Sequence, residues 1–403
     1  MLYDFYQATA DFGDFVRSLA ANSEGLLKAW PTGALSPSRQ AAAFCEAIAL
    51  AGFTHDRPGY EISTVEVRGE TIPVLEDVVL STPFCDLRRF RKATSVDEPK
   101  VLLIAPMSGH FATLLRGTAR TLLRDHEVFL TDWINARDIP ADAGVFGFDD
   151  YTQHLIDFIR RIGSDAHIVA VCQPAVSALA ATTVMAQHMN NHQPRSLTLM
   201  AGPIDTRISP TKVNELATKY PLQWFEDNLI SVAPKRLKGG GRRVYPGFLQ
   251  LTAFMSMNPE RHLKSFLDMV NHRIKGEHQK ADAIHEFYKE YFAVMDLSAE
   301  FFLETVAQVF QEATLPLGKM RFKGERIDPR AIRKTFLLTV EGEKDDICAV
   351  GQTLAAQDLC SGLRPYMKTH HMQAGVGHYG VFNGKKWENQ IYPVVRNHIQ
   401  SSR

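Results

Sequence analysis

Cysteine is scarce in this sequence. The 403 residues include five cysteines, and no two of them have the Cys-x-x-Cys spacing. An odd number of scattered cysteines argues against both a disulfide framework and a zinc knuckle. Each cysteine is then either a small core residue, which is the commoner case, or a reactive thiol. The five are Cys45, Cys85, Cys172, Cys348 and Cys360.

Net charge and long apolar runs are absent as well. The chain has 45 basic and 45 acidic side chains, so its overall charge attracts neither nucleic acid nor anionic lipid. Apolar runs such as residues 101–105 and 168–171 are far shorter than the roughly 20 residues of a membrane-spanning helix. The opening residues include an early aspartate and lack the basic region of a secretory signal. We therefore expect a cytoplasmic protein with no nucleic-acid partner and no membrane span.

Internal repeats and low-complexity tracts are also missing, but the chain has ample material for a folded core. Hydrophobic residues make up 45% of it, enough for one enlarged α/β domain or a domain with an insertion. Residues 1–57 have helical spacing with aromatic residues on one face, and Ser36-Pro37 is a typical helix start. These residues predict a helical N-terminal arm that packs on the main domain.

Strands and helices alternate through most of the remaining chain. Residues 62–80 change to a period of two around Gly69, which indicates strands of an antiparallel edge. Further strands are predicted at 101–105, 128–130, 168–171, 197–200, 335–340 and 368–372, with helices at about 113–124, 151–162, 347–357 and 387–400. The alternation predicts a doubly wound, mostly parallel sheet formed by residues 58–205 and 315–403, with ligands at the carboxyl ends of the strands.

The alternation stops between residues 206 and 314. Helical spacing dominates this stretch, which is rich in large flexible or aromatic side chains. We expect a helical insertion that covers the strand ends as a lid, with part of its apolar stripe lining a substrate groove. The residues proposed for the groove are Phe248, Phe254 and Met255.

Cys172 has a context that the other cysteines lack. It follows the apolar strand 168–171, and an alanine-rich helix starts within two residues. A strand, a sharp turn and a helix form the nucleophile elbow of α/β-hydrolases, which presents one side chain above the sheet. Ala170 and Pro174 replace the glycines of the Gly-x-Ser-x-Gly pattern, which weakens the case for a generic lipase. A small residue and a proline in the first helical turn still permit this geometry.

An acid and a histidine follow Cys172 in the chain order of an α/β-hydrolase triad. Asp345 ends the Gly-Glu-Lys-Asp segment after strand 335–340, and His378 lies in a glycine-rich loop after the last strand. In this arrangement Cys172 is the nucleophile, His378 the general base, and Asp345 the carboxylate that orients the imidazole. Less favoured candidates for the last two roles are Asp346, His370 and His371.

Two backbone N–H groups are expected to form an oxyanion hole. One belongs to Gln173, directly after the nucleophile, and the other to Met107, in the turn after strand 101–105. Ser108 and His110 lie in the same turn and are candidates for direct contact with substrate.

Four motifs resemble those of the intracellular polyhydroxybutyrate depolymerases. They are Ala-Val-Cys-Gln-Pro-Ala at 170–175, Ala-Pro-Met-Ser-Gly-His-Phe-Ala-Thr-Leu at 105–114, Val-Glu-Gly-Glu-Lys-Asp-Asp-Ile-Cys at 340–348 and Gly-Val-Gly-His-Tyr-Gly-Val-Phe-Asn-Gly at 375–384. The resemblance runs through essentially the whole chain, from the Met-Leu-Tyr-Asp-Phe-Tyr-Gln start. It implies an α/β-hydrolase fold and a cysteine nucleophile, with the triad on Cys172, Asp345 and His378.

The residues and the resemblance together predict an enzyme that cleaves ester bonds of amorphous poly(3-hydroxybutyrate) through a thioester on Cys172. It would release 3-hydroxybutyrate monomer or oligomers. No cofactor or metal is expected, and either water or the thiol of coenzyme A can accept the acyl group. The resemblance implies association with the surface of polyhydroxybutyrate granules, and the sequence leaves homo-oligomer formation open.

Three other functions fit parts of the pattern. A polyhydroxyalkanoate synthase-like acyltransferase uses related cysteine chemistry, but it usually has a Gly-x-Cys-x-Gly motif, which is missing here. A non-catalytic granule-associated protein would use the aromatic arm and the lid for binding alone. A small-ester esterase is less suited to so large an insertion.

Overall fold

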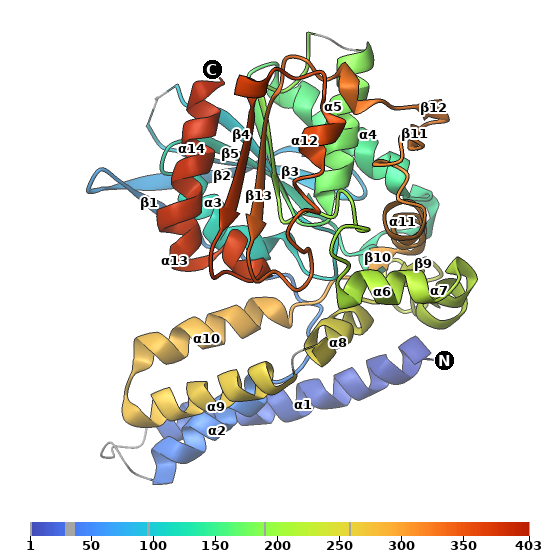
Figure 1. Ribbon diagram of the computed structural model, residues 1–403. Coiled ribbons are helices and arrows are strands. Elements are labelled where there is room, and N and C mark those ends of the chain that lie inside the picture. The colour runs from blue at the N-terminus through green and yellow to red at the C-terminus, as the bar shows by residue number, and fades with distance from the viewer. Residues whose placement is uncertain (1, 29–36, 95–96, 189–190, 258, 403) are drawn as a thin grey trace.

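The computed structural model describes residues 2–28, 37–94, 97–188, 191–257 and 259–402. Its principal strands are β1 (Thr64–Val67), β2 (Glu70–Ser81), β3 (Cys85–Lys92), β4 (Lys100–Ile104), β5 (Glu127–Trp133), β6 (Ala166–Val171), β7 (Ser196–Met200), β13 (Phe336–Gly342) and β14 (Lys368–Gln373). They form one sheet in the order β1-β2-β3-β5-β4-β6-β7-β13-β14 (Figure 1). Pairing is antiparallel from β1 to β5 and parallel from β5 to β14. This topology confirms the predicted α/β-hydrolase fold.

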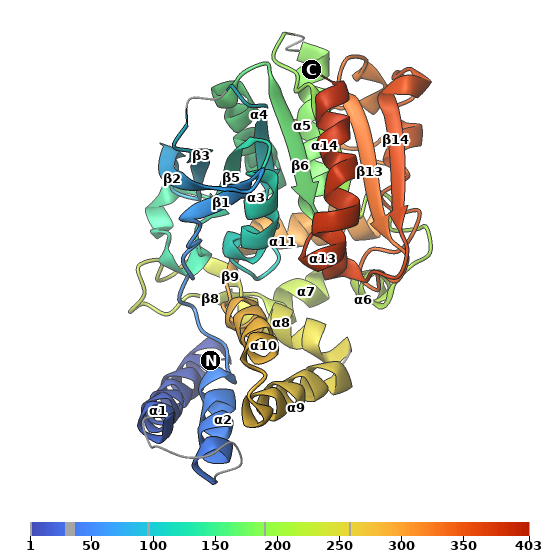
Figure 2. The ribbon, with the colours of Figure 1, turned by 90° about the vertical axis from the view of Figure 1, so that its left-hand side faces the viewer.

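Helices cover both faces of the sheet. The α-helices are α1 (Leu2–Lys28), α2 (Pro37–Leu50), α3 (Arg116–Leu122), α4 (Phe148–Ile162), α5 (Pro174–His188), α6 (Lys212–Lys219), α7 (Leu222–Leu229), α8 (Gly247–Met257), α9 (Pro259–Lys275), α10 (His278–Tyr291), α11 (Ala299–Thr305), α12 (Ala356–Leu359), α13 (Gly384–Lys386) and α14 (Tyr392–Ser401). Helices α3 and α14 lie on one face, and α4 and α5 lie on the other (Figures 1 and 2). Every residue of β6 and β7 is therefore buried, which accounts for their mostly apolar sequences.

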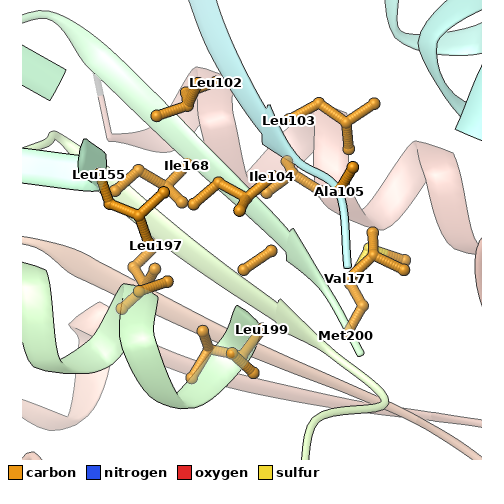
Figure 3. Packing of buried hydrophobic residues seen from close by; sticks show 14 of the residues in the cluster. Leu102, Leu103, Ile104, Ala105, Leu155, Ile168, Val171, Leu197, Leu199 and Met200 are labelled. Carbon is orange, nitrogen blue, oxygen red and sulfur yellow. The ribbon is translucent and has the colours of Figure 1, made fainter. Parts of the chain in front are cut away.

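The core between α4 and the central strands is formed by apolar side chains that pack across adjacent strands. Leu155 of α4 packs beside Ile168 of β6 and Leu197 of β7, which are paired residues of adjacent strands (Figure 3). All three side chains are buried. Replacement of a leucine by alanine in such packing typically lowers the free energy of unfolding by about 2–5 kcal/mol.

Residues 206–314, predicted as a helical insertion, contain helices α6 to α11. They also contain a small sheet of β8 (Ser231–Val232), β9 (Arg243–Tyr245) and β10 (Leu297–Ser298), which the sequence did not indicate. Helix α11 continues into a π-helical segment, Val306–Gln311. Helices α8 and α10 lie beyond one end of the parallel strands (Figure 2). Among the helices that the structure describes, none combines the length and apolarity needed to cross a membrane.

The N-terminal helices pack on the insertion rather than on the sheet, contrary to the expectation that the arm packs on the main domain. Helix α2 lies between α1 and α9 (Figure 2). Glu46 of α2 accepts two hydrogen bonds from Arg273 of α9, at 2.7 and 2.8 Å. Tyr3 of α1 donates a hydrogen bond to the buried carboxylate of Asp296, which also accepts the Gly247 N–H at 2.9 Å. Sequence periodicity gives no information about such long-range pairings.

Strand β3 was not predicted because its charged sequence has no alternation of apolar and polar residues, and its buried Leu87 and Phe90 lie on opposite faces. Leu87 and Phe90 point into the core, while Arg88 and Arg89 between them are partly exposed. Arg89 forms an ion pair with Asp77 of β2 at 2.6 Å. Cross-strand ion pairs of this kind let a charged sequence form an inner strand of an antiparallel edge.

Other boundaries also differ from the prediction. Residues 347–357 form turns that end in the short helix α12, where one continuous helix was expected. The terminal helix starts as α13 and passes through a π-helical segment, Trp387–Ile391, before α14. A hairpin of β11 (Arg321–Phe322) and β12 (Glu325–Arg326) was not foreseen. The predicted cap, Ser36, lies outside the described residues.

Candidate active site

Cys172 occupies a sharp turn between β6 and α5. Its φ angle is 67°, in the left-handed region, which costs about 1–2 kcal/mol for a residue other than glycine. The turn is fixed by hydrogen bonds from Cys172 N–H to the Met200 carbonyl (2.8 Å) and from Ala175 N–H to the Cys172 carbonyl (3.0 Å). Gly202 allows the close approach of the next loop, because a Cβ there would lie 2.1 Å from the Ala175 Cβ. The strained turn thus presents the Cys172 side chain at the carboxyl edge of the sheet, as expected of a nucleophile elbow.

Asp345 and His378 meet at the same edge. The Asp345 carboxylate accepts a hydrogen bond from His378 Nδ1 at 2.8 Å, and both side chains are buried. Its other oxygen accepts the N–H groups of Ile347 (2.9 Å) and Cys348 (2.8 Å). These bonds hold the carboxylate in one orientation and leave His378 Nε2 directed away from Asp345.

His378 also interacts with the Cys172 side chain. Burial lowers the pKa of His378, but its interactions with Asp345 and Cys172 raise that pKa well above its ordinary value. Cysteine attacks carbonyl carbon as the thiolate, and a neighbouring histidine is the group that can take up the thiol proton. The three side chains can therefore perform nucleophilic acyl transfer.

The less favoured acid and histidines differ from Asp345 and His378 in their surroundings. Asp346 is exposed, next to the buried Asp345. His370 on β14 forms a hydrogen bond with Thr339 at 3.0 Å, and His371 forms one with Gln373 at 3.0 Å. Both histidines thus have partners along the sheet rather than in the loop that contains His378.

The two residues proposed for the oxyanion hole are in contact, in a way that the sequence did not indicate. The Met107 N–H donates a hydrogen bond to the Gln173 side-chain oxygen at 3.3 Å. The Gln173 side-chain nitrogen is buried and has no hydrogen-bond partner within the described chain. The Gln173 amide therefore occupies the acceptor position at Met107 N–H, and a substrate carbonyl has to displace it.

Gln173→Ala is expected to keep kcat for a soluble ester within about tenfold of wild type, because both proposed donors are backbone N–H groups. Steady-state kinetics on a short-chain aryl ester, with a thermal melt as the control for folding, measures this. A loss of about 10²-fold or more in a folded variant would instead identify the Gln173 side-chain amide as an oxyanion donor.

A cavity of about 600 Å³ lies beside His378, between the insertion and the loops after β13 and β14. We call it the His378 cavity. Its volume is within the range of roughly 300–1,000 Å³ that is usual for ligand sites. Its walls include Phe254, Arg261, Phe287, Tyr291, His378 and Tyr379. The insertion therefore supplies mostly aromatic walls, and the catalytic loop supplies the edge.

The five proposed substrate contacts fall in different places. Phe254 lines the His378 cavity. Phe248 stacks on Tyr6 of the N-terminal arm, with ring centroids 3.6 Å apart, and Met255 packs against the apolar cluster around α10. Ser108 is partly buried in the turn after β4.

His110, the fifth of these residues, is buried behind the cavity wall. Its ring lies 5.0 Å from that of Tyr291 and is parallel to that of Phe254 at 6.5 Å. Burial lowers the pKa of His110 to about 4, so the imidazole is neutral and supports the two aromatic walls.

Tyr379 and Tyr291 were not among the proposed site residues. Their rings lie 6.1 Å apart, edge to face, and this contact joins the loop of His378 to helix α10. Burial raises the pKa of Tyr379, and the nearby charges of Tyr291 and Cys172 raise it further. A tyrosine directly after the proposed base was the available signal, but nothing in the sequence pairs it with a residue of the insertion.

Three of the other four cysteines differ from Cys172 in exposure. Burial raises the pKa of Cys85, Cys348 and Cys360, which keeps them as thiols. Cys45 and Cys172 are partly exposed. In the part of the chain that the structure describes, no three His, Cys, Asp or Glu side chains are grouped so that they could hold a metal ion.

A sequence profile described as PHB de-polymerase C-terminus matches residues 201–403, which is half of the chain. The chain belongs to this family. It is accordingly an ester hydrolase of the polyhydroxybutyrate depolymerase type. The match includes the insertion, Asp345 and His378, whereas Cys172 precedes it. None of the curated protein sequences matches the chain.

Solved structures of hydrolases and esterases have a similar fold. The 2-hydroxy-6-oxo-6-phenylhexa-2,4-dienoate hydrolase of Rhodococcus sp. strain RHA1 is 13% identical, with 82% of this chain and 100% of that one covered and a TM-score of 0.45. A thermophilic esterase of Thermogutta terrifontis is 12% identical, with 84% and 97% covered and a TM-score of 0.42. A carboxylesterase of Nitrososphaera gargenis is 13% identical, with 84% and 98% covered and a TM-score of 0.41. At these identities the likeness concerns the fold alone.

Proposed function

We propose that this enzyme hydrolyses ester bonds of poly(3-hydroxybutyrate) through a thioester on Cys172. The observation that carries the proposal is the meeting of three side chains at the end of the elbow strand: His378 Nδ1 donates to Asp345 at 2.8 Å, and the imidazole interacts with Cys172. Family membership supports the polyester as substrate. The aromatic walls of the His378 cavity suit a polymer whose repeating unit has methyl and methylene groups.

Acylation proceeds by attack of the Cys172 sulfur on the ester carbonyl carbon. A C–S bond forms and the carbonyl oxygen becomes an oxyanion, which the N–H groups of Met107 and Gln173 stabilise. The C–O bond to the departing segment then breaks, and His378 gives its proton to the departing oxygen. Asp345 keeps the imidazole oriented and stabilises its charged form throughout.

Deacylation repeats these reaction steps with a new acceptor for the acyl group. His378 takes a proton from water, the resulting hydroxide attacks the thioester carbonyl, and the C–S bond breaks to return Cys172 as thiolate. The carboxylic acid that leaves is the other product. We propose water as the acceptor. The thiol of coenzyme A would give the coenzyme A ester by the same steps.

Product analysis on native amorphous granules tests this function. With wild-type enzyme and no added thiol, 3-hydroxybutyrate and its short oligomers are expected, and the Cys172→Ala variant should release none. Addition of coenzyme A shows which acceptor is used, because thiolysis would convert the product into a coenzyme A ester. Incubation with 3-hydroxybutyryl-coenzyme A is the counter-test, since polymer accumulation would identify a synthase and overturn the proposal.

We also propose that the N-terminal arm and α9 contact the polymer surface. Large apolar side chains are exposed on these three adjacent helices: Phe15, Val16, Leu19 and Leu26 of α1, Phe44 and Ile48 of α2, and Leu263 and Leu267 of α9. Together they form what we call the helical apolar face. The opposite side of α9 contributes Arg261 and Ser265 to the wall of the His378 cavity. A granule bound to this face would therefore lie near the site of cleavage.

The double variant Leu263→Ser/Leu267→Ser is expected to bind granules at least about tenfold more weakly, because each buried leucine contributes roughly 1.5–3 kcal/mol. Its kcat/KM for a soluble ester should not change. Sedimentation with amorphous granules measures the binding. Leu75→Ser/Val78→Ser on β2 is the matched control, since both side chains are exposed away from the three helices. Equal loss of binding in both double variants would contradict the assignment of this face.

A further inference from the structure

The His378 cavity adjoins the histidine of the proposed triad. His378 and its neighbours Gly377 and Tyr379 form part of the cavity wall. In the proposed mechanism His378 gives its proton to the departing oxygen, so the departing segment has to lie beside this histidine. Because its lining includes His378 but not Cys172, the cavity suits the leaving group better than the acyl group.

The chemistry of the polymer determines which end the leaving group carries. In a poly(3-hydroxy acid), each ester joins a carbonyl group to the 3-oxygen of the next unit. Cleavage leaves the carbonyl side on Cys172 and releases the other side as an alcohol. That alcohol continues to the carboxyl terminus of the polymer. When the cut is made near this terminus, the leaving group is a short 3-hydroxy acid with a free carboxylate.

The cavity has cations that suit such a carboxylate. Arg261 of α9 and Lys385 and Lys386 of α13 are among its lining residues, against one carboxylate, Asp346. Within the described chain no carboxylate lies within ion-pair distance of the Arg261 guanidinium. Lys386 donates one hydrogen bond to the Ala374 carbonyl at 2.9 Å, which fixes the ammonium group at this rim.

Arg261 is also close to the aromatic end of the cavity. Its positive charge acts on the hydroxyl groups of both Tyr291 and Tyr379, the pair that joins α10 to the loop of His378. The lining also includes Phe254 and Phe287, which can contact the methyl and methylene groups of a hydroxybutyrate unit. A cavity lined by both aromatic and cationic side chains can bind the alkyl part and the carboxylate of a 3-hydroxy acid.

We propose that the His378 cavity is a leaving-group subsite that binds the terminal carboxylate of the polyester, so that the enzyme releases short 3-hydroxy acids from the carboxyl end. The inference rests on the proposed function and adds the place along the polymer where the bond is cut. It makes Arg261 the principal residue that selects a free carboxylate, with Lys385 and Lys386 adding to the positive potential of the rim.

Blocked oligomers test the inference directly. Linear trimers of 3-hydroxybutyrate are prepared as the free acid, as the methyl ester of the carboxyl end, and as the acetyl ester of the hydroxyl end. The wild-type enzyme is expected to have a kcat/KM about tenfold higher for the free acid than for the methyl ester. Blocking the hydroxyl end should not reduce the rate, because that end lies on the acyl side.

Arg261→Gln should bring the ratio of kcat/KM for the free acid to that for the methyl ester close to one, mainly through a higher KM for the free acid. Lys264→Gln is the matched control on the same helix, because Lys264 is exposed and pairs with Asp268 at 2.5 Å. It should leave the ratio at the wild-type value. An unchanged ratio in Arg261→Gln, or equal rates for the two trimers with wild-type enzyme, would overturn the inference.

A binding measurement separates this inference from the proposed function. Titration calorimetry of the Cys172→Ala variant with the free acid trimer and with its methyl ester needs no catalysis. Tighter binding of the free acid, lost in Cys172→Ala/Arg261→Gln, supports the subsite even if the chemistry differs from our proposal. Hydrolysis of both trimers by wild-type enzyme with no difference in binding would support the function and reject the subsite.

Discussion

Replacement of Cys172 by alanine is expected to lower kcat for ester hydrolysis by roughly 10⁴-fold or more. Cys172 supplies the sulfur that forms the proposed thioester, and the turn that presents it is held by backbone hydrogen bonds to β7 and α5. Alanine preserves the backbone of this turn and removes only the nucleophile. The variant should therefore keep the wild-type melting temperature within a few degrees while losing activity on soluble esters and on granules alike.

Cys45→Ala is the matched control for this variant. Cys45 and Cys172 are both partly exposed, whereas the thiols of Cys85, Cys348 and Cys360 are buried. Activity of Cys45→Ala should equal that of wild type. A thiol-alkylating reagent should accordingly inactivate the enzyme in step with labelling of the peptide that contains Cys172. Full activity in Cys172→Ala, or inactivation in step with labelling of Cys45 alone, would contradict the nucleophile assignment.

Asp345→Asn is expected to lower kcat by about 10³- to 10⁴-fold, with a much smaller effect of Asp346→Asn. The Asp345 carboxylate accepts the His378 Nδ1–H at 2.8 Å and two backbone N–H groups. An asparagine cannot satisfy all three donors with one oxygen, and it removes the negative charge that stabilises the imidazolium. Asp346 is exposed, so the kcat of Asp346→Asn should stay within about tenfold of the wild-type kcat.

The pH dependence of the same two variants gives an independent readout. The charge of Asp345 is one of the influences that raise the pKa of His378, so its removal lowers that pKa. The imidazolium beside Cys172 then loses its proton at a lower pH. The alkaline limb of the kcat/KM profile is expected to move to lower pH in Asp345→Asn and to stay in place in Asp346→Asn. The reverse ranking of the two variants would assign the acid role to Asp346.

Much of the sheet could be predicted from the sequence because its inner strands are buried on both faces. Strands β4, β6 and β7 have short apolar runs, which is the pattern of a parallel strand covered by helices. Strand β3 was missed because Arg88 and Arg89 satisfy their charges on neighbouring strands, which sequence alone does not reveal. The place of the N-terminal arm was wrong because it depends on pairings such as Tyr3 with Asp296, which are remote in sequence.

The candidate site also has a part that could be predicted from the sequence and a part that could not. Cys172, Asp345 and His378 each follow a strand, so chain order and the shared sheet edge were enough to propose that they meet. The contact of the Gln173 side chain with Met107 N–H depends on a rotamer and on the spacing of two loops. Arg261, Tyr291 and Tyr379 come together only because the insertion covers the loop of His378. No local pattern specifies how helices more than 80 residues away in sequence are placed over that loop.

The acyl-enzyme is the species that tests the central claim most directly. Wild-type enzyme is mixed with a soluble 3-hydroxybutyrate ester, quenched in acid during the first turnover, digested and examined by peptide mass spectrometry. One 3-hydroxybutyryl group should be found on the peptide that contains Cys172, and neutral hydroxylamine should remove it, as expected of a thioester. The same group on Ser108, or on any residue other than Cys172, would contradict the account.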